Sequence, residues 1–134
     1  MNAYQVYRQT QTQTAAPGEL VLMLYRGAIR FLSSAIEAID AKDTAEAHNK
    51  LVRTQDIVAS LLGSLDHERG GDVARNLSAL YDYMLRRLVE ANVRKDAGPA
   101  REVQGLLREL LPAWEAAVKQ TTNERSGALV GTNR

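Results

Sequence analysis

Apolar residues recur at alternating spacings of three and four along residues 72–95, around the stretch NLSALYDYMLRRL at 76–88. This spacing places them in one stripe on a helix with 3.6 residues per turn. The stripe consists of Val73, Leu77, Leu80, Met84, Leu88 and Ala91, and a second row beside it of Ala74, Tyr81 and Leu85. Because two rows are wider than a two-stranded coiled coil needs, the pattern predicts a helix that is covered by several neighbouring helices.

Three further segments show helical periodicity, so the sequence predicts an all-α fold. Short polar turns between the segments favour an antiparallel up-down four-helix bundle. The first sixteen residues are rich in Gln and Thr and predict an extended N-terminal arm, and the last fourteen predict a disordered, flexible C-terminal tail. The predicted arm covers residues 1–16, the bundle 17–120 with helices at about 17–41, 43–65, 72–95 and 99–120, and the tail 121–134.

Individual residues mark where these helices begin and where they are disturbed. Pro17 suits a first helical position, where the missing N–H of proline does no harm. Asp43 followed by Glu46 predicts a capping box at the start of the second helix. Gly27 lies mid-helix, where it costs about 1 kcal/mol relative to Ala, so we expect a close approach by a neighbouring helix. Pro112 removes a backbone hydrogen bond and predicts a kink in the last helix.

Composition restricts the class of protein further. A chain of 134 residues suits one domain. It has no cysteine, which excludes disulfides and thiolate metal sites. The formal net charge of +1, with basic and acidic residues interspersed, argues against nucleic-acid binding. No stretch is long and apolar enough for membrane insertion, and the start of the chain has no signal pattern, so we expect a cytoplasmic protein.

Motifs for catalysis or for a cofactor are lacking. A di-iron bundle requires Glu-x-x-His pairs, but His48 follows Glu46 by two residues and His67 lies in a polar turn. Phosphotransfer by His48 is one alternative, although Lys50, two residues on, points away from it on a helix. We therefore expect no enzyme activity, no metal site and no cofactor.

Several motifs together resemble one family. They are Ala3-Tyr4 near the start, APGELVLMLYRGAI at residues 16–29, RGGDVARNLSALYDYMLRRLVEANVRKDA at 69–97, and the helix carrying Trp114. On these stretches the chain resembles the FliS family of flagellar secretion chaperones. Two positions depart from the family pattern: Ala16 stands where Ser is usual, which removes an N-cap worth roughly 1 kcal/mol, and Arg26 stands where Asp is usual.

The resemblance implies a function. It implies a cytoplasmic helical-bundle chaperone that binds the carboxy-terminal segment of flagellin, prevents its premature polymerisation and delivers it to the flagellar type III export gate. An amphipathic, assembly-prone segment that folds into a groove between apolar helices fits this role.

The second predicted helix carries more apolar residues than a bundle seam requires, which indicates where such a groove lies. We expect the flagellin-binding residues to be Ile57, Leu61, Leu65 and Tyr81. The alternative for each is an ordinary core position. The N-terminal arm is expected to act as a lid over the groove until flagellin displaces it, through Tyr4, Val6 and Tyr7.

A different class of protein remains open beside the chaperone and the phosphotransfer bundle. In a homodimeric or larger homo-oligomeric structural bundle, the same surplus of apolar residues contacts a second copy. In the sequence alone, a groove that awaits a client and one that self-associates look the same.

Overall fold

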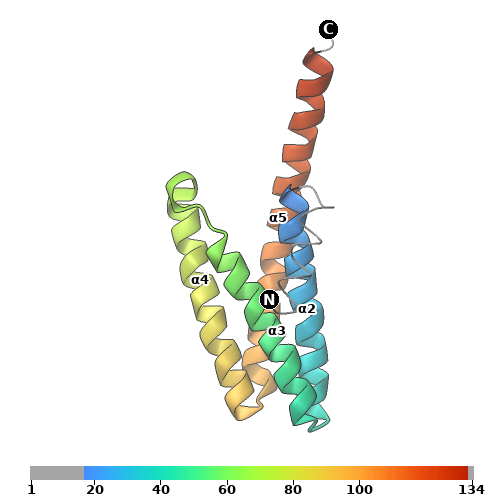
Figure 1. The fold of residues 1–134 in the computed structure, drawn as a ribbon, viewed down its shortest axis with the longest axis vertical. Helices are drawn as coiled ribbons and strands as arrows, with labels where there is room; N and C mark the ends of the chain where they lie inside the picture. Colours follow the sequence, from blue (N-terminus) through green and yellow to red (C-terminus); the bar gives the residue numbers. More distant parts are fainter. Residues whose placement is uncertain (1–16, 133–134) are drawn as a thin grey trace, which may run out of the picture.

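The computed structural model describes residues 17–132, and within this range it contains four α-helices and no strand. They are α2 (Pro17–Asp40), α3 (Thr44–Gly63), α4 (His67–Arg94) and α5 (Ala97–Thr132). Consecutive helices run in opposite directions, and each packs against two neighbours in the cyclic order α2, α3, α4, α5 (Figure 1). The predicted all-α antiparallel four-helix bundle is confirmed.

The helix ends follow local backbone chemistry. α2 begins at Pro17, as predicted. The Asp43 side chain accepts a hydrogen bond from the backbone N–H of Glu46 at 3.2 Å and so caps α3. At the carboxy-terminal end of α4, Lys95 adopts a left-handed backbone conformation with φ of 50°, which ends the helix. The predicted start of α3 is therefore shifted by only one residue.

α4 begins earlier than the predicted residue 72. The Asp66 side chain accepts hydrogen bonds from the backbone N–H groups of Glu68 and Arg69, each at 3.1 Å, and this cap starts a helical turn at His67. Gly71 then interrupts the helix with φ of 51°, a conformation that glycine adopts without steric cost. The sequence predicted a glycine-containing loop before residue 72, and the structure has one additional helical turn in this segment.

α5 is longer than predicted at both ends. The Asp96 side chain caps it by accepting a hydrogen bond from the Gly98 N–H at 2.9 Å. The helix continues through Pro112 and past the expected end at residue 120 to Thr132. Just beyond residue 120, the Thr121 and Thr122 hydroxyls donate to the backbone carbonyls of Ala117 and Val118 at 3.0 Å, so these hydroxyls are paired within the helix. Flexibility of residues 121–134 stays a prediction, and the arm at 1–16 lies outside the described residues.

The bundle is packed more completely at one end than at the other, although Leu22, Leu61 and Ala74 are buried at the less packed end too. At the end that holds the α2–α3 and α4–α5 turns, which we call the closed end, large and small apolar side chains are fully buried: Leu32, Leu51, Leu88, Ala91, Ala100 and Val103. At the opposite, open end, many apolar side chains are only partly buried: Leu20, Leu62, Leu65, Leu77, Leu80, Leu110 and Trp114. Figure 1 shows α4 and the end of α3 diverging from α2 and α5 there.

Gly27 is buried where α2 faces α3, but its surroundings have room for a side chain. A Cβ atom added there would lie 3.6 Å from Ile57 Cδ1, an ordinary van der Waals contact. The close approach that the sequence suggested is therefore not required. By contrast, a Cβ atom at Gly18 would lie 3.1 Å from Val118 Cγ2, where the neighbour has to give way.

We predict that Gly27→Ala raises the unfolding free energy by about 0.5–1 kcal/mol, because Ala has the higher helix propensity and no contact is lost. Urea denaturation followed by circular dichroism measures this. The control Gly18→Ala should gain less or lose stability. A Gly27→Ala variant less stable than the wild type would show that the α2–α3 packing does not tolerate the methyl group.

Candidate functional site

The inner stripe of α4 is buried at the closed end and uncovered at the open end. Met84 and Leu88 are fully buried, Leu77 and Leu80 are partly buried, and Val73 is 67% exposed. A bundle helix normally covers its whole apolar stripe with neighbouring helices. The amino-terminal half of α4 therefore presents apolar surface that this chain's described residues leave partly open.

Hydrogen bonds fix how α4 and α5 lie against each other. The Tyr83 hydroxyl donates to both carboxylate oxygens of Glu102 at 2.9 Å, and Arg87 Nε donates to Glu102 Oε1 at 2.7 Å. Because the two helices are antiparallel, moving toward the open end lowers the residue number on α4 and raises it on α5. This contact therefore sets the register of the residues beyond it.

Leucines from both helices follow this contact toward the open end. Leu80 lies about one turn from Tyr83 on α4, and Leu106 lies about one turn from Glu102 on α5. The next turn brings Leu77 and Leu110 to a similar level. All four side chains are partly buried. We call Leu77, Leu80, Leu106 and Leu110 the open seam.

The open seam lies between the helices that pack least. Of the four neighbouring helix pairs, α4 and α5 make the least extensive contact, while α2 packs extensively on both α3 and α5. Figure 1 shows the two helices separating toward the open end. A partner helix that enters here would bury leucine side chains without displacing the closed-end core.

Tyr25 is the centre of a buried polar cluster at the boundary between the two ends. Its hydroxyl lies 2.5 Å from the Tyr81 hydroxyl and accepts a hydrogen bond from Trp114 Nε1 at 3.0 Å. The rings of Tyr25 and Trp114 are tilted, with centroids 6.1 Å apart. Burial raises the pKa of both tyrosines, so both hydroxyls stay protonated at neutral pH. The cluster joins α2, α4 and α5.

The Glu102 cluster is exposed and carries complementary charges. The Arg87 hydrogen bond, followed by that of Tyr83, lowers the pKa of Glu102, and the same carboxylate raises the pKa of Tyr83 and of Arg87. Arg87 also pairs with Glu90 on its own helix. The guanidinium therefore lies between two carboxylates and is fully charged.

The structure places most of the expected flagellin-binding residues in the core. Ile57, Leu61 and Tyr81 are 3%, 2% and 1% exposed, which is the core alternative that the sequence left open. Leu65 is partly buried at the open end. The expected lid residues Tyr4, Val6 and Tyr7 lie outside the described part of the chain.

The leucines of α5 in the open seam, Leu106 and Leu110, were not expected at the site. Their helical spacing was visible in the sequence, but the pattern is the same for a covered and an uncovered leucine. Tertiary packing decides between the two, because the divergence of α4 from α5 is not encoded in any local motif.

The outer face of α4 carries two exposed valines. Val89 is 49% exposed and Val93 is 79% exposed. Val93 lies about 180° around the helix from the centre of the inner stripe, and Val89 lies about 140° from it. Isolated exposed valines are common on soluble proteins, so these two serve best as controls for the inner face.

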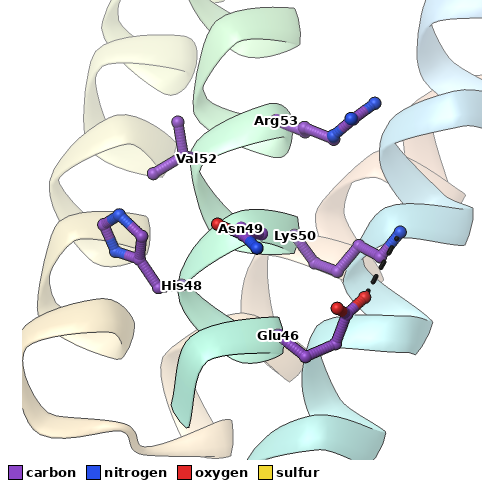
Figure 2. Close-up of a pocket in the computed structure, with 6 residues that line it drawn as sticks. All are labelled: Glu46, His48, Asn49, Lys50, Val52 and Arg53. Carbon is purple, nitrogen blue, oxygen red and sulfur yellow. Dashed lines mark ion pairs between the residues drawn. The ribbon is translucent and has the colours of Figure 1, made fainter.

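His48 and Lys50 point in different directions from α3 (Figure 2). His48 points toward α4, where its Nδ1 lies 3.0 Å from Asn92 Nδ2. Lys50 points toward α2, forms an ion pair with Glu46 at 3.4 Å and lies 5.4 Å from the ring centre of Phe31. The two side chains therefore do not combine at one site, and the geometry gives no support to phosphotransfer.

Arg26, where the family pattern usually has Asp, has a partner on α5. Its guanidinium forms an ion pair with Glu115 at 3.1 Å. Both side chains are nearly half exposed, so this pair contributes little to stability. Glu115 therefore accommodates the change of sign at position 26.

The described residues contain neither a metal-binding cluster nor a membrane-spanning helix. Among the described residues no group of three or more His, Cys, Asp or Glu side chains is arranged to hold a metal ion. None of the helices in residues 17–132 combines the length and the apolar character needed to cross a bilayer.

Sequence comparisons match the chain to one family. The family described as "Flagellar protein FliS" matches residues 1–121. The chain is 37% identical over 127 residues to the flagellar secretion chaperone FliS of Bacillus subtilis, covering 95% of this chain and 94% of the relative. It is 39% identical over 112 residues to FliS of Salmonella typhimurium, covering 83% of each. It is 36% identical over 111 residues to the flagellar secretion chaperone FliSB of Pseudomonas aeruginosa, covering 83% of this chain and 88% of the relative.

Glu102 is expected to stabilise the fold only while it is ionised. Because its pKa is lower in the folded than in the unfolded chain, its contribution is complete above the unfolded value and is lost as the pH falls through the folded value. The unfolding free energy of the wild type should therefore fall more steeply than that of Glu102→Gln between about pH 5 and about pH 3. Urea denaturation at each pH measures both slopes.

The matched control for this experiment is Glu109→Gln, on the same helix. Glu109 is exposed and forms no hydrogen bond or ion pair with another residue of the described range. In this variant the unfolding free energy should fall with decreasing pH as steeply as in the wild type. If Glu102→Gln also shows the wild-type slope, Glu102 has no stabilising charge interaction in solution.

Proposed function

The chain belongs to the FliS family of flagellar secretion chaperones, and on this basis we propose that it binds the carboxy-terminal segment of flagellin in the cytoplasm. In this proposal the bound chain prevents premature polymerisation of flagellin and delivers it to the flagellar type III export gate. The protein acts by binding and carries out no catalytic step.

The open seam is the observation that carries this proposal. A client segment that is amphipathic would bury its own apolar stripe against the four leucines, in the helix-in-groove mode of recognition. Burial of apolar surface on both sides supplies the free energy that offsets the ordering of a flexible client segment. The same client surface is then hidden from other flagellin molecules.

The proposed binding surface extends from the open seam to Leu65, in the turn after α3. Ile57, Leu61 and Tyr81 lie in the core next to this region. They would contact flagellin directly only after the α3–α4 hairpin moves, so their direct role stays a prediction. The lid role of the arm that carries Tyr4, Val6 and Tyr7 is also retained as a proposal.

The alternatives differ in how well the geometry supports them. Phosphotransfer by His48 would have to proceed without Lys50, because Lys50 points to the other side of α3 (Figure 2). A homodimer would use the same open seam for a second copy. Light scattering with and without flagellin distinguishes this case, since a client-binding surface predicts a one-to-one complex in place of the dimer.

The test is titration calorimetry against a peptide of the flagellin carboxy-terminal segment, with circular dichroism of each partner alone and mixed. We predict a saturable one-to-one complex with a negative heat-capacity change and added helix. Leu80→Asp should raise the Kd at least about tenfold, because it places a charge in the apolar seam. Val93→Asp, on the outer face of α4, should bind like the wild type.

The folding of each variant is checked by its circular dichroism melt, and Leu80→Ala replaces Leu80→Asp if the latter does not fold. Equal loss of affinity in the Val93 and Leu80 variants would contradict the location of the site. No heat and no added helix with a folded wild-type chain would contradict flagellin as the client.

The lid is tested separately by deleting residues 1–12. If the arm competes with flagellin for the groove, the truncated chain should bind the peptide with the same or higher affinity, because no arm has to be displaced. Calorimetry under the same conditions measures the change in Kd. Weaker binding would show that the arm belongs to the binding site.

A further inference from the structure

The side-chain hydrogen bonds between α4 and α5 converge on one carboxylate. Within the described residues, each such bond joins Glu102 of α5 to Tyr83 or Arg87 of α4. The other two ion pairs that hold α5 in place, Arg26 with Glu115 and Arg101 with Asp40, connect it to α2. Glu102 therefore provides the exposed side-chain hydrogen bonds across the least packed helix pair, and the buried Tyr81–Tyr25–Trp114 cluster connects the same two helices through α2.

The Glu102 carboxylate lies between the closed-end core and the open seam. On its closed-end side, Leu88 and Val103 are fully buried and hold α4 and α5 in the common core. On its open-end side the leucines of the open seam are only partly buried. An outward movement of α4 about the closed end would therefore strain the Glu102 hydrogen bonds together with the buried Tyr25–Tyr81 contact, while Leu88 and Val103 stay packed.

The contact of Glu102 with Tyr83 and Arg87 is specific in geometry and weak enough to open reversibly. Charge-assisted hydrogen bonds to a bidentate carboxylate are geometrically specific. The side chains of Arg87 and Glu102 are 29% and 41% exposed, so water can replace their hydrogen bonds when the helices separate. A buried pair in the same place would cost far more to open.

We propose that Glu102, together with Tyr83 and Arg87, is a latch that limits the separation of α4 from α5 and is released when a helical client enters the open seam. This inference rests on the proposed function for the identity of the client. The latch itself is a property of the free chain. Its two parts, limiting the separation and opening on binding, are tested separately.

The first test measures the separation of the two helices without any client. The chain has no native cysteine, so Val73→Cys and Ala113→Cys provide two spin-labelling sites on the open-end parts of α4 and α5. Double electron–electron resonance spectroscopy then gives the distribution of distances between the two spin labels. In Glu102→Gln this distribution should broaden and shift to longer distances, whereas Glu115→Gln, which removes the α2–α5 pair, should match the unmodified background.

An unchanged distribution in Glu102→Gln, with folding confirmed by circular dichroism, would overturn the latch whether or not flagellin binds. A longer distance in a chain that binds no flagellin peptide would support the latch and overturn the proposed client instead. The two hypotheses therefore fail in distinguishable ways.

The second test measures peptide affinity by calorimetry. If binding has to release the latch, Glu102→Gln should bind the flagellin peptide about two- to fivefold more tightly, since no exposed ion pair has to be broken. Glu115→Gln should bind like the wild type. Weaker binding by Glu102→Gln would overturn release on binding and show that the latch holds the seam in its binding-competent form.

Discussion

The hydrogen bonds of the Tyr25 hydroxyl connect three helices at the boundary between the closed end and the open end of the bundle. Tyr25 and Tyr81 reach across the centre of the bundle from α2 and α4, and Trp114 adds α5. Buried hydroxyls are costly unless they are paired, so this cluster fixes how α4 crosses the other helices. On one side of it apolar side chains from all four helices are fully buried, and on the other side α4 diverges and leaves leucines without full cover.

This uneven packing explains how a small bundle can be stable and still have apolar surface for a client. The closed end supplies fully buried apolar side chains from all four helices, while the open end keeps partly exposed apolar area. Such area is a liability in a protein without a partner, because it favours self-association. In the proposed chaperone function the same area is the binding surface, and in the proposed latch the exposed Glu102 contact restrains it between clients.

Much of the fold was predictable from the sequence. Helical periodicity gave four helices, and Pro17 and the Asp43 cap marked two starts that the structure confirms. The extra turn at His67 was missed because it depends on a cap by the Asp66 side chain, which helix propensity does not report. The extension of α5 to Thr132 was also missed. The family was also evident from long motifs. The candidate site was not evident from the sequence, since Ile57 and Leu61 show the same periodicity as Leu80 and Leu106. Only the crossing of α4 over α5 determines which of these side chains remain accessible.

The central claim is that flagellin is held at the open seam and not at the closed end or the outer face. Hydrogen–deuterium exchange of the full chain, alone and saturated with the flagellin carboxy-terminal peptide, tests it most directly. The account predicts slower exchange in residues 73–80 and 106–110 on binding, with little change in residues 44–51 at the closed end. Slower exchange confined to the closed end, with residues 73–80 and 106–110 unchanged, would contradict it.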